Sequence, residues 1–189
     1  KGLFIAHTLG FAGKINEILD IARKYNIQVF FDNCDAYACT YNGKPLPAYG
    51  KASSYSFYVA HHITMGEGGA VFTNNAALAR IAESFRDWGR DCYCQPGKDN
   101  TCGKRFDWCL GDLPHGYDHK YTYSHLGYNL KSGDIQAAIG LAQLDRLDNF
   151  VTLRKKNWAK LRSGLAELDE YLILPEATEN SDPSWFGFA

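Results

Sequence analysis

The sequence lacks a long apolar run and an excess of either charge, and both absences exclude whole classes of protein. No stretch of about 18 uncharged apolar residues occurs, and the first residues show no basic-then-apolar signal pattern, so neither a membrane span nor export is indicated. The net charge of -1 argues against the clustered Lys and Arg residues of a nucleic-acid binder. With 46% apolar and 22% charged residues, the chain is expected to bury one sizeable core and to be cytoplasmic.

An initiator methionine is also missing. The chain begins at Lys1, enters the apolar stretch Leu3 to Ala6 directly, and stops at Ala189 after an aromatic-rich run. Both ends resemble the middle of a fold, so we expect the intact protein to be considerably longer.

Short-range periodicity predicts alternating helices and strands, which is typical of the α/β class. Apolar residues at helical spacing predict a helix over residues 15–22, and the β-rich run 27–31, which stops at Asp32, predicts a buried strand. Further elements are predicted as strands at 53–58 and 70–73, a turn at 66–69 and a helix from about 76 to 88.

The second half of the chain begins with an irregular stretch. Residues 89–129 are rich in Gly, Pro, Tyr, Asp and Cys without any period, which is too long for a simple connector unless a bound group orders it. Ser132 is then expected to cap a helix whose apolar repeat continues to Leu147. A second helix over 154–168 and a strand over 171–174 are expected to follow.

Asp32 is the first candidate site residue. Ligands of open α/β sheets bind beyond the carboxyl ends of strands, so a carboxylate at this position either faces a cation or caps the next turn. Taken alone, the two interpretations are equally supported. Four features follow Asp32 in order along the chain: Ser56-Phe57-Tyr58, Gly66-Glu67-Gly68-Gly69, Arg86-Asp87-Trp88-Gly89, and Gly127-Tyr128-Asn129 before the Gln136-Ala137-Ala138 helix.

This order resembles the DegT/DnrJ/EryC1/StrS family of sugar aminotransferases over nearly the whole chain. The resemblance implies the aspartate-aminotransferase type of fold (PLP fold type I), represented here by the C-terminal part of the large domain and the start of the small domain. Residues 1–150 would belong to the large cofactor-binding α/β domain, with a cysteine-rich cluster loop at 89–125, and residues 151–189 would start the small domain.

The resemblance also implies roles for three residues at the cofactor. Asp32 would pair with the protonated pyridine nitrogen, so that the ring can act as an electron sink. Ser56 would lie near the cofactor phosphate. Asn129 would reach a phosphate in the neighbouring subunit of a homodimer.

His61 departs from the family pattern. Five residues after the serine of the Ser-Phe-Tyr motif, the aminotransferases carry the lysine that binds the cofactor covalently, and no lysine occurs from Ala52 through Gly97. An imidazole cannot form that link, so the cofactor is expected to be held non-covalently as pyridoxamine 5'-phosphate. Because the histidine pKa lies near neutrality, His61 is a suitable general base. An unplaced His61-His62 pair would more often be packing, but at this position catalysis is favoured.

Asp35 is a second departure, because the family usually has Gln or His three residues after the pyridinium aspartate. Asp35 is expected to adjust the cofactor's hydroxyl face or to contact the substrate. A solvated or capping aspartate is an equally good interpretation.

Four of the six cysteines form a pattern: Cys34, Cys92, Cys94 and Cys102. In a cytoplasmic chain they are expected to be reduced or bound to metal, and their spacing suits either zinc or an iron-sulfur cluster. Cys39 and Cys109 lie outside the pattern and are expected to be ordinary buried cysteines.

Within the family, these cysteines and His61 together resemble the nucleotide-sugar 3-dehydrases, which carry a [2Fe-2S] cluster on four such ligands. The resemblance implies 3-dehydration of a CDP-4-keto-6-deoxyhexose in 3,6-dideoxysugar and O-antigen biosynthesis. An NADH-dependent reductase would supply electrons singly. A cluster-free 3-dehydratase should lack the four cysteines and a PLP sugar aminotransferase should have a lysine at position 61. A zinc-stabilised, non-catalytic binding module would leave Asp32, Ser56 and Asn129 unexplained.

Overall fold

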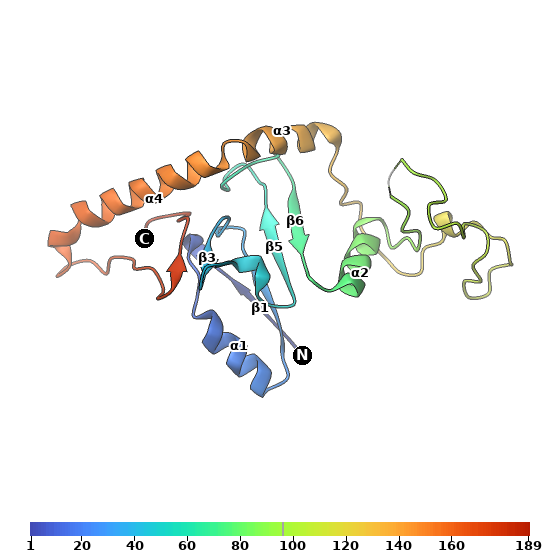
Figure 1. Ribbon diagram of the computed structural model, residues 1–189, viewed down its shortest axis with the longest axis horizontal. Coiled ribbons are helices and arrows are strands. Elements are labelled where there is room, and N and C mark those ends of the chain that lie inside the picture. The colour runs from blue at the N-terminus through green and yellow to red at the C-terminus, as the bar shows by residue number, and fades with distance from the viewer. Residues whose placement is uncertain (96) are drawn as a thin grey trace. The chain divides into compact units, whose positions relative to one another are not determined.

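A four-stranded mixed sheet is the central element of the computed structural model, which describes residues 1–95 and 97–189 (Figure 1). Its strand order is β1-β2-β5-β6, where β1 is Gly2–Ala6, β2 is Gln28–Asp32, β5 is Ala52–Ser56 and β6 is Gly69–Phe72. The first three strands are parallel and β6 is antiparallel to β5. The predicted α/β class is confirmed. Position 96, within the predicted cluster loop, lies outside the described residues.

Helix α1 (Ile15–Lys24) connects β1 to β2 and supplies part of the core. Ile15 and Ala22 are buried, in agreement with the predicted apolar face. The helix ends because Asn26 adopts a left-handed conformation (φ 50°) and the Ile27 amide bonds back to the Ala22 carbonyl at 2.8 Å. The core gathers α1, β2 and the residues after it: Ala12, Ile15, Ala22, Val29, Phe31, Ala36, Cys39, Tyr41 and Leu46.

A small antiparallel sheet, with order β4-β3-β7, joins distant parts of the chain. Strands β3 (Thr40–Tyr41) and β4 (Lys44–Pro45) form a hairpin, and β7 (Ser181–Asp182) pairs with β3. The strand predicted at 171–174 is wrong, because these residues have no ladder partner among the described residues and Ile173 is 100% exposed. The remaining short elements are the 3-10 turns η1 (Thr8–Gly10), η2 (Leu46–Ala48), η3 (His119–Tyr121) and η4 (Ala166–Leu168).

Three further helices follow the sheet: α2 (Ala76–Arg86), α3 (Asp134–Leu144) and α4 (Leu147–Gly164). The predicted cap at Ser132 is one residue early, because α3 begins after Gly133, whose amide donates to Gln136 Oε1 at 2.7 Å. Helix α4 begins before the predicted residue 154. No helix in the described residues is long and apolar enough to span a bilayer.

The chain divides into two units, one of residues 1–74 with 132–189 and one of residues 75–131. The first unit contains both sheets and the second contains α2 and the cysteine-rich stretch. The predicted boundary at residue 150 between a large and a small domain stays a prediction.

Candidate functional site

Asp32 lies at the carboxyl end of β2, as the sequence predicted. Its Oδ1 accepts hydrogen bonds from the Cys34 amide at 3.0 Å and from the Ser54 hydroxyl at 3.1 Å. These bonds hold the carboxylate in one orientation at the edge of the sheet where the parallel strands end. A fixed anion at this edge suits a cationic ring nitrogen.

His7 is a neighbour of Asp32 that the sequence reasoning missed. Its backbone amide donates to the Asp32 carbonyl at 2.9 Å, and its ring stacks on Phe31 with 4.8 Å between the centroids. Burial lowers the pKa of His7 to about 4, although the Asp32 charge opposes that shift. The available signal was its position directly after an apolar strand, which matches the position of Asp32.

His61 and Asp35 form a pair in the same unit. His61 Nδ1 lies 3.5 Å from Asp35 Oδ1, and the two side chains are 16% and 28% exposed. At this distance the two side chains make an ion-pair contact without a hydrogen bond, because the buried His61 Nδ1 has no hydrogen-bond partner among the described residues. Asp35 was predicted to contact the cofactor or the substrate, whereas the structure pairs it with the predicted base.

His62 points to a different environment from His61. The residue is 4% exposed, and its Nε2 lies 2.8 Å from the hydroxyl oxygen of Ser184. Burial, together with the positive charge of Arg154, lowers the pKa of His62 to about 4. Of the two adjacent imidazoles, His61 is the one that lies beside a carboxylate and keeps part of its side chain exposed.

Ser56 is the last residue of β5, and its hydroxyl oxygen accepts from the Tyr58 amide at 3.2 Å. The hydroxyl proton remains available for a phosphate oxygen. Asn129 is exposed in the second unit, where it forms a backbone bridge with Asp87. The predicted roles of Ser56 and Asn129 stay predictions.

The four pattern cysteines fall in both units. Cys92, Cys94 and Cys102 belong to the second unit, and Cys34 belongs to the first. Hydrogen bonds from Thr101 and from the Cys102 backbone lower the pKa of Cys94 to about 6, whereas burial and the Asp32 carboxylate raise the pKa of Cys34 to about 12. Cys94 is therefore suited to bind as a thiolate, while Cys34 would have to lose a tightly held proton.

The remaining cysteine predictions have mixed outcomes. Within residues 1–95 and 97–189, no three His, Cys, Asp or Glu side chains form a group that could hold a metal ion. Cys39 is buried, as predicted, but Cys109 is exposed, so the prediction of burial is wrong there. Its stretch forms no helix or strand that would cover it.

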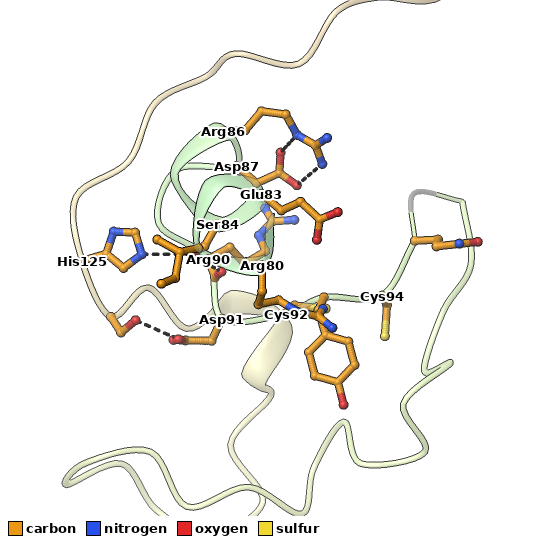
Figure 2. A pocket seen from close by; sticks show the side chains of 14 residues that line it. Arg80, Glu83, Ser84, Arg86, Asp87, Arg90, Asp91, Cys92, Cys94 and His125 are labelled. Carbon is orange, nitrogen blue, oxygen red and sulfur yellow. Dashed lines mark hydrogen bonds and ion pairs between the residues drawn. The ribbon is translucent and has the colours of Figure 1, made fainter. Parts of the chain in front are cut away.

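A cavity of about 250 Å³ lies in the second unit beside the cysteines (Figure 2). Cys92 and Cys94 line it, and its wall includes Ser84, whose hydroxyl lies 3.0 Å from His125 Nε2. Three arginines and three acidic residues contribute to the lining: Arg80, Arg86, Arg90, Glu83, Asp87 and Asp91.

Comparison with known proteins identifies relatives of this chain. The chain is 62% identical over 188 residues to "Lipopolysaccharide biosynthesis protein RfbH" of Salmonella typhimurium, covering all of this chain and 43% of that protein. It is 55% identical over 189 residues to a "dTDP-4-dehydro-2,6-dideoxy-D-glucose 3-dehydratase" of Saccharopolyspora spinosa, covering 41% of that protein. The chain thus spans less than half the length of these relatives.

Solved structures match the fold over the whole chain. The E. coli GDP-4-keto-6-deoxy-D-mannose-3-dehydratase with bound hydrated PLP superposes with a TM-score of 0.77 at 26% identity, over 46% of its own length. An aminotransferase TlmJ from Streptoalloteichus hindustanus superposes with a TM-score of 0.79 at 21% identity, over 44% of its length, which shows the fold alone. The predicted aminotransferase-type fold is confirmed. All 189 residues match one family description, and the chain belongs to the DegT/DnrJ/EryC1/StrS aminotransferase family.

Proposed function

We propose that the complete protein containing this chain is a CDP-4-keto-6-deoxyglucose 3-dehydrase of lipopolysaccharide biosynthesis, dependent on pyridoxamine phosphate and an iron-sulfur cluster. The observation that carries the proposal is the contact of His61 Nδ1 with Asp35 Oδ1 at 3.5 Å, at a position where the family resemblance implies a lysine that binds the cofactor covalently. The name of the relative at 62% identity supports a role in lipopolysaccharide biosynthesis, and that of the relative at 55% identity supports sugar 3-dehydration.

The residues of the first unit fit the cofactor. Asp32 presents an oriented carboxylate for the ring nitrogen, and Ser56 keeps a hydroxyl proton for the phosphate. Asn129 is proposed to bind a phosphate across a homodimer. When bound, pyridoxamine phosphate would supply the amine that reacts with the 4-keto group and a ring that accepts electron density.

His61 is the proposed general base. Its Nε2 would take the proton released from the 4′ carbon of the cofactor, while the charge of the nearby Asp35 carboxylate would stabilise the imidazolium that forms. Loss of the sugar C3 hydroxyl would follow. Without a lysine at this position, an ordinary transamination cycle is not supported, which ranks dehydration above amination.

Cys34, Cys92, Cys94 and Cys102 are proposed to hold a [2Fe-2S] cluster. The proposal rests on the family resemblance and on ligand type, because thiolates are the usual ligands of such a cluster and the lowered pKa of Cys94 favours one. The described residues themselves form no group that could hold a metal ion. When bound, the cluster would supply one-electron transfer, and an NADH-dependent reductase would be the electron source.

The test is turnover of CDP-4-keto-6-deoxyglucose by the complete protein with pyridoxamine phosphate, NADH and a reductase, alongside iron and sulfide analysis. We expect His61→Gln to lower turnover about 100- to 10,000-fold, which is the usual contribution of a general base, and His61→Lys to lose dehydration. The matched control is His115→Gln, at an exposed position outside the site. Full dehydration by His61→Lys would contradict the role of His61.

The cluster has a separate test. Cys94→Ser should lose iron, sulfide and the red-brown absorption, and with them reductive turnover, while still binding the cofactor. Cys109→Ser, which changes an exposed cysteine outside the pattern, is the matched control. Bound zinc in place of iron, or full reductive turnover by Cys94→Ser, would contradict the cluster.

A further inference from the structure

The two adjacent histidines, His61 and His62, have opposite surroundings. His61 faces Asp35 and keeps 16% of its side chain exposed, whereas His62 is buried against Ser184, whose own exposure is 0%. The proposed mechanism uses His61 and leaves His62 without a role. A buried imidazole with a defined hydrogen bond next to a base requires an explanation of its own.

The hydrogen bonds of Ser184 determine which nitrogen of His62 carries the proton. A serine hydroxyl has one proton, and that of Ser184 is donated to the Tyr37 carbonyl. The same oxygen can therefore only accept from His62, so Nε2 is the protonated nitrogen of that ring. Nδ1 of His62 is buried without a partner among the described residues, as expected for the bare nitrogen of a neutral imidazole.

Ser184 belongs to a docked segment, residues 184–186, that is held at several points. The Ser184 amide donates to Cys39 Sγ at 3.1 Å, and the Phe186 amide donates to the Leu9 carbonyl at 2.9 Å. Arg154 donates to the Trp185 and Phe186 carbonyls at 3.3 Å. The docked segment is thus attached to several separate parts of the first unit.

The docked segment also contacts the proposed base. The Phe186 ring centroid lies 5.4 Å from that of His61 and 6.0 Å from that of His62. A side chain that is buried and hydrogen-bonded at position 62 limits the movement of the backbone that it shares with His61. Holding the His62 ring therefore restricts the backbone from which His61 reaches Asp35.

We propose that His62 and Ser184 form a positioning pair, in which the neutral His62 donates to Ser184 and so fixes His61 between Asp35 and the docked segment. This role rests on the proposed function of His61 as the base. Neither residue touches the reacting atoms. Misplacement of a reacting group by about 1 Å can cost roughly 100-fold in rate, so a positioning pair would act on kcat rather than on substrate binding.

The test compares Ser184→Ala with Ser181→Ala in the complete protein. Ser181 is a matched control, because its hydroxyl bonds only locally to the Thr178 carbonyl. We expect Ser184→Ala to lower kcat about tenfold or more with KM for the sugar nucleotide within about twofold, since positioning is lost but binding groups remain. Cofactor absorbance should be unchanged, and Ser181→Ala should behave as wild type.

Two substitutions of His62 separate positioning from packing. His62→Gln keeps an amide that can donate to Ser184 and should retain most of kcat, whereas His62→Leu fills the space without a donor and should lose it. Equal losses in the two variants, or wild-type kcat in His62→Leu and Ser184→Ala, would overturn the proposal. If Ser184→Ala fails to fold, the kcat values of His62→Gln and His62→Leu test the positioning role on their own.

A readout without turnover separates this proposal from the proposed function. Carbethoxylation of His61, followed by peptide mass spectrometry, should be several-fold faster in Ser184→Ala than in wild type, because the ring is no longer held. If the wild-type protein does not dehydrate the sugar, the proposed function fails, and this labelling rate still tests whether Ser184 and His62 hold His61. An unchanged labelling rate would overturn the positioning role.

Discussion

Mild acid should destabilise the protein through two buried histidines, His7 and His62. Burial lowers the pKa of each from 6.5 to about 4 in the folded state. Both rings are therefore neutral when folded, and the unfolded chain takes up their protons first as the pH falls below 6.5. The stability that their neutral forms provide is complete above pH 6.5 and is lost progressively down to pH 4.

The size of the effect follows from the pKa difference. One pKa unit corresponds to about 1.4 kcal/mol, so each histidine should cost about 2 kcal/mol at pH 5 and the two together about 4 kcal/mol. That is a large part of the roughly 5–15 kcal/mol by which a domain is stable. The paired carboxylates Asp87, Asp99 and Asp118 have pKa values lowered from 3.8, so they titrate below this interval.

The assay is urea unfolding at pH 7 and pH 5, followed by tryptophan fluorescence. Between the two pH values, the free energy of unfolding of the wild type should fall by about 4 kcal/mol more than that of a His7→Asn, His62→Gln double variant, in which Cys94, whose pKa is lowered to about 6, still contributes acid sensitivity. Each single variant should remove about half of this difference, and the exposed control His115→Gln none of it. A double variant as acid-sensitive as the wild type would refute the reasoning.

Two further predictions concern the backbone at the docked segment and the cysteines. Gly10→Ala should destabilise the protein by more than Gly43→Ala in urea unfolding. Both glycines have positive φ (82° and 70°), so the backbone strain of alanine is similar at the two sites. A Cβ at Gly10 would lie 2.3 Å from the Phe186 amide nitrogen, whereas a Cβ at Gly43 would have nothing within 4 Å. Equal losses of unfolding free energy in the two variants would contradict this reasoning. In metal-free protein at pH 7, iodoacetamide should alkylate Cys94 well before Cys34, because their pKa values are about 6 and about 12. Peptide mass spectrometry over time measures both rates, and the reverse order would refute the assignment.

Patterns of neighbouring residues predicted the helices and strands that depend mainly on the sequence close to them. Helix α1 and strand β2 follow from the apolar repeat of one and the β-rich run of the other, and both bury the expected side chains. Asp32 could be placed because the residue after a parallel strand lies at the ligand-binding edge. The strand predicted at 171–174 is wrong because local composition does not show whether a partner strand exists. The apolar run resembles a strand, but it has no ladder partner among the described residues.

Distant contacts carry no local signal, so they could not be predicted. The pairing of β7 with β3, and the bond between Ser184 and His62, join residues far apart in the sequence. Asp35 and His61 were each predicted as site residues, a prediction that stands, but their pairing became visible only in three dimensions. His7 was overlooked because a lone histidine after a short strand resembles many core histidines.

The contact between His62 and Ser184 spans 122 positions of the chain. At roughly 5–20 residues per second, a ribosome needs about 6–24 s to make the second residue after the first. Throughout that interval the nascent polypeptide carries an imidazole whose acceptor does not yet exist, and the loop between the two residues can close only after Ser184 has been added. Slow closure of such long-range contacts is typical of folds with high contact order, so we expect the nascent chain to acquire the proposed catalytic arrangement later than its sheet.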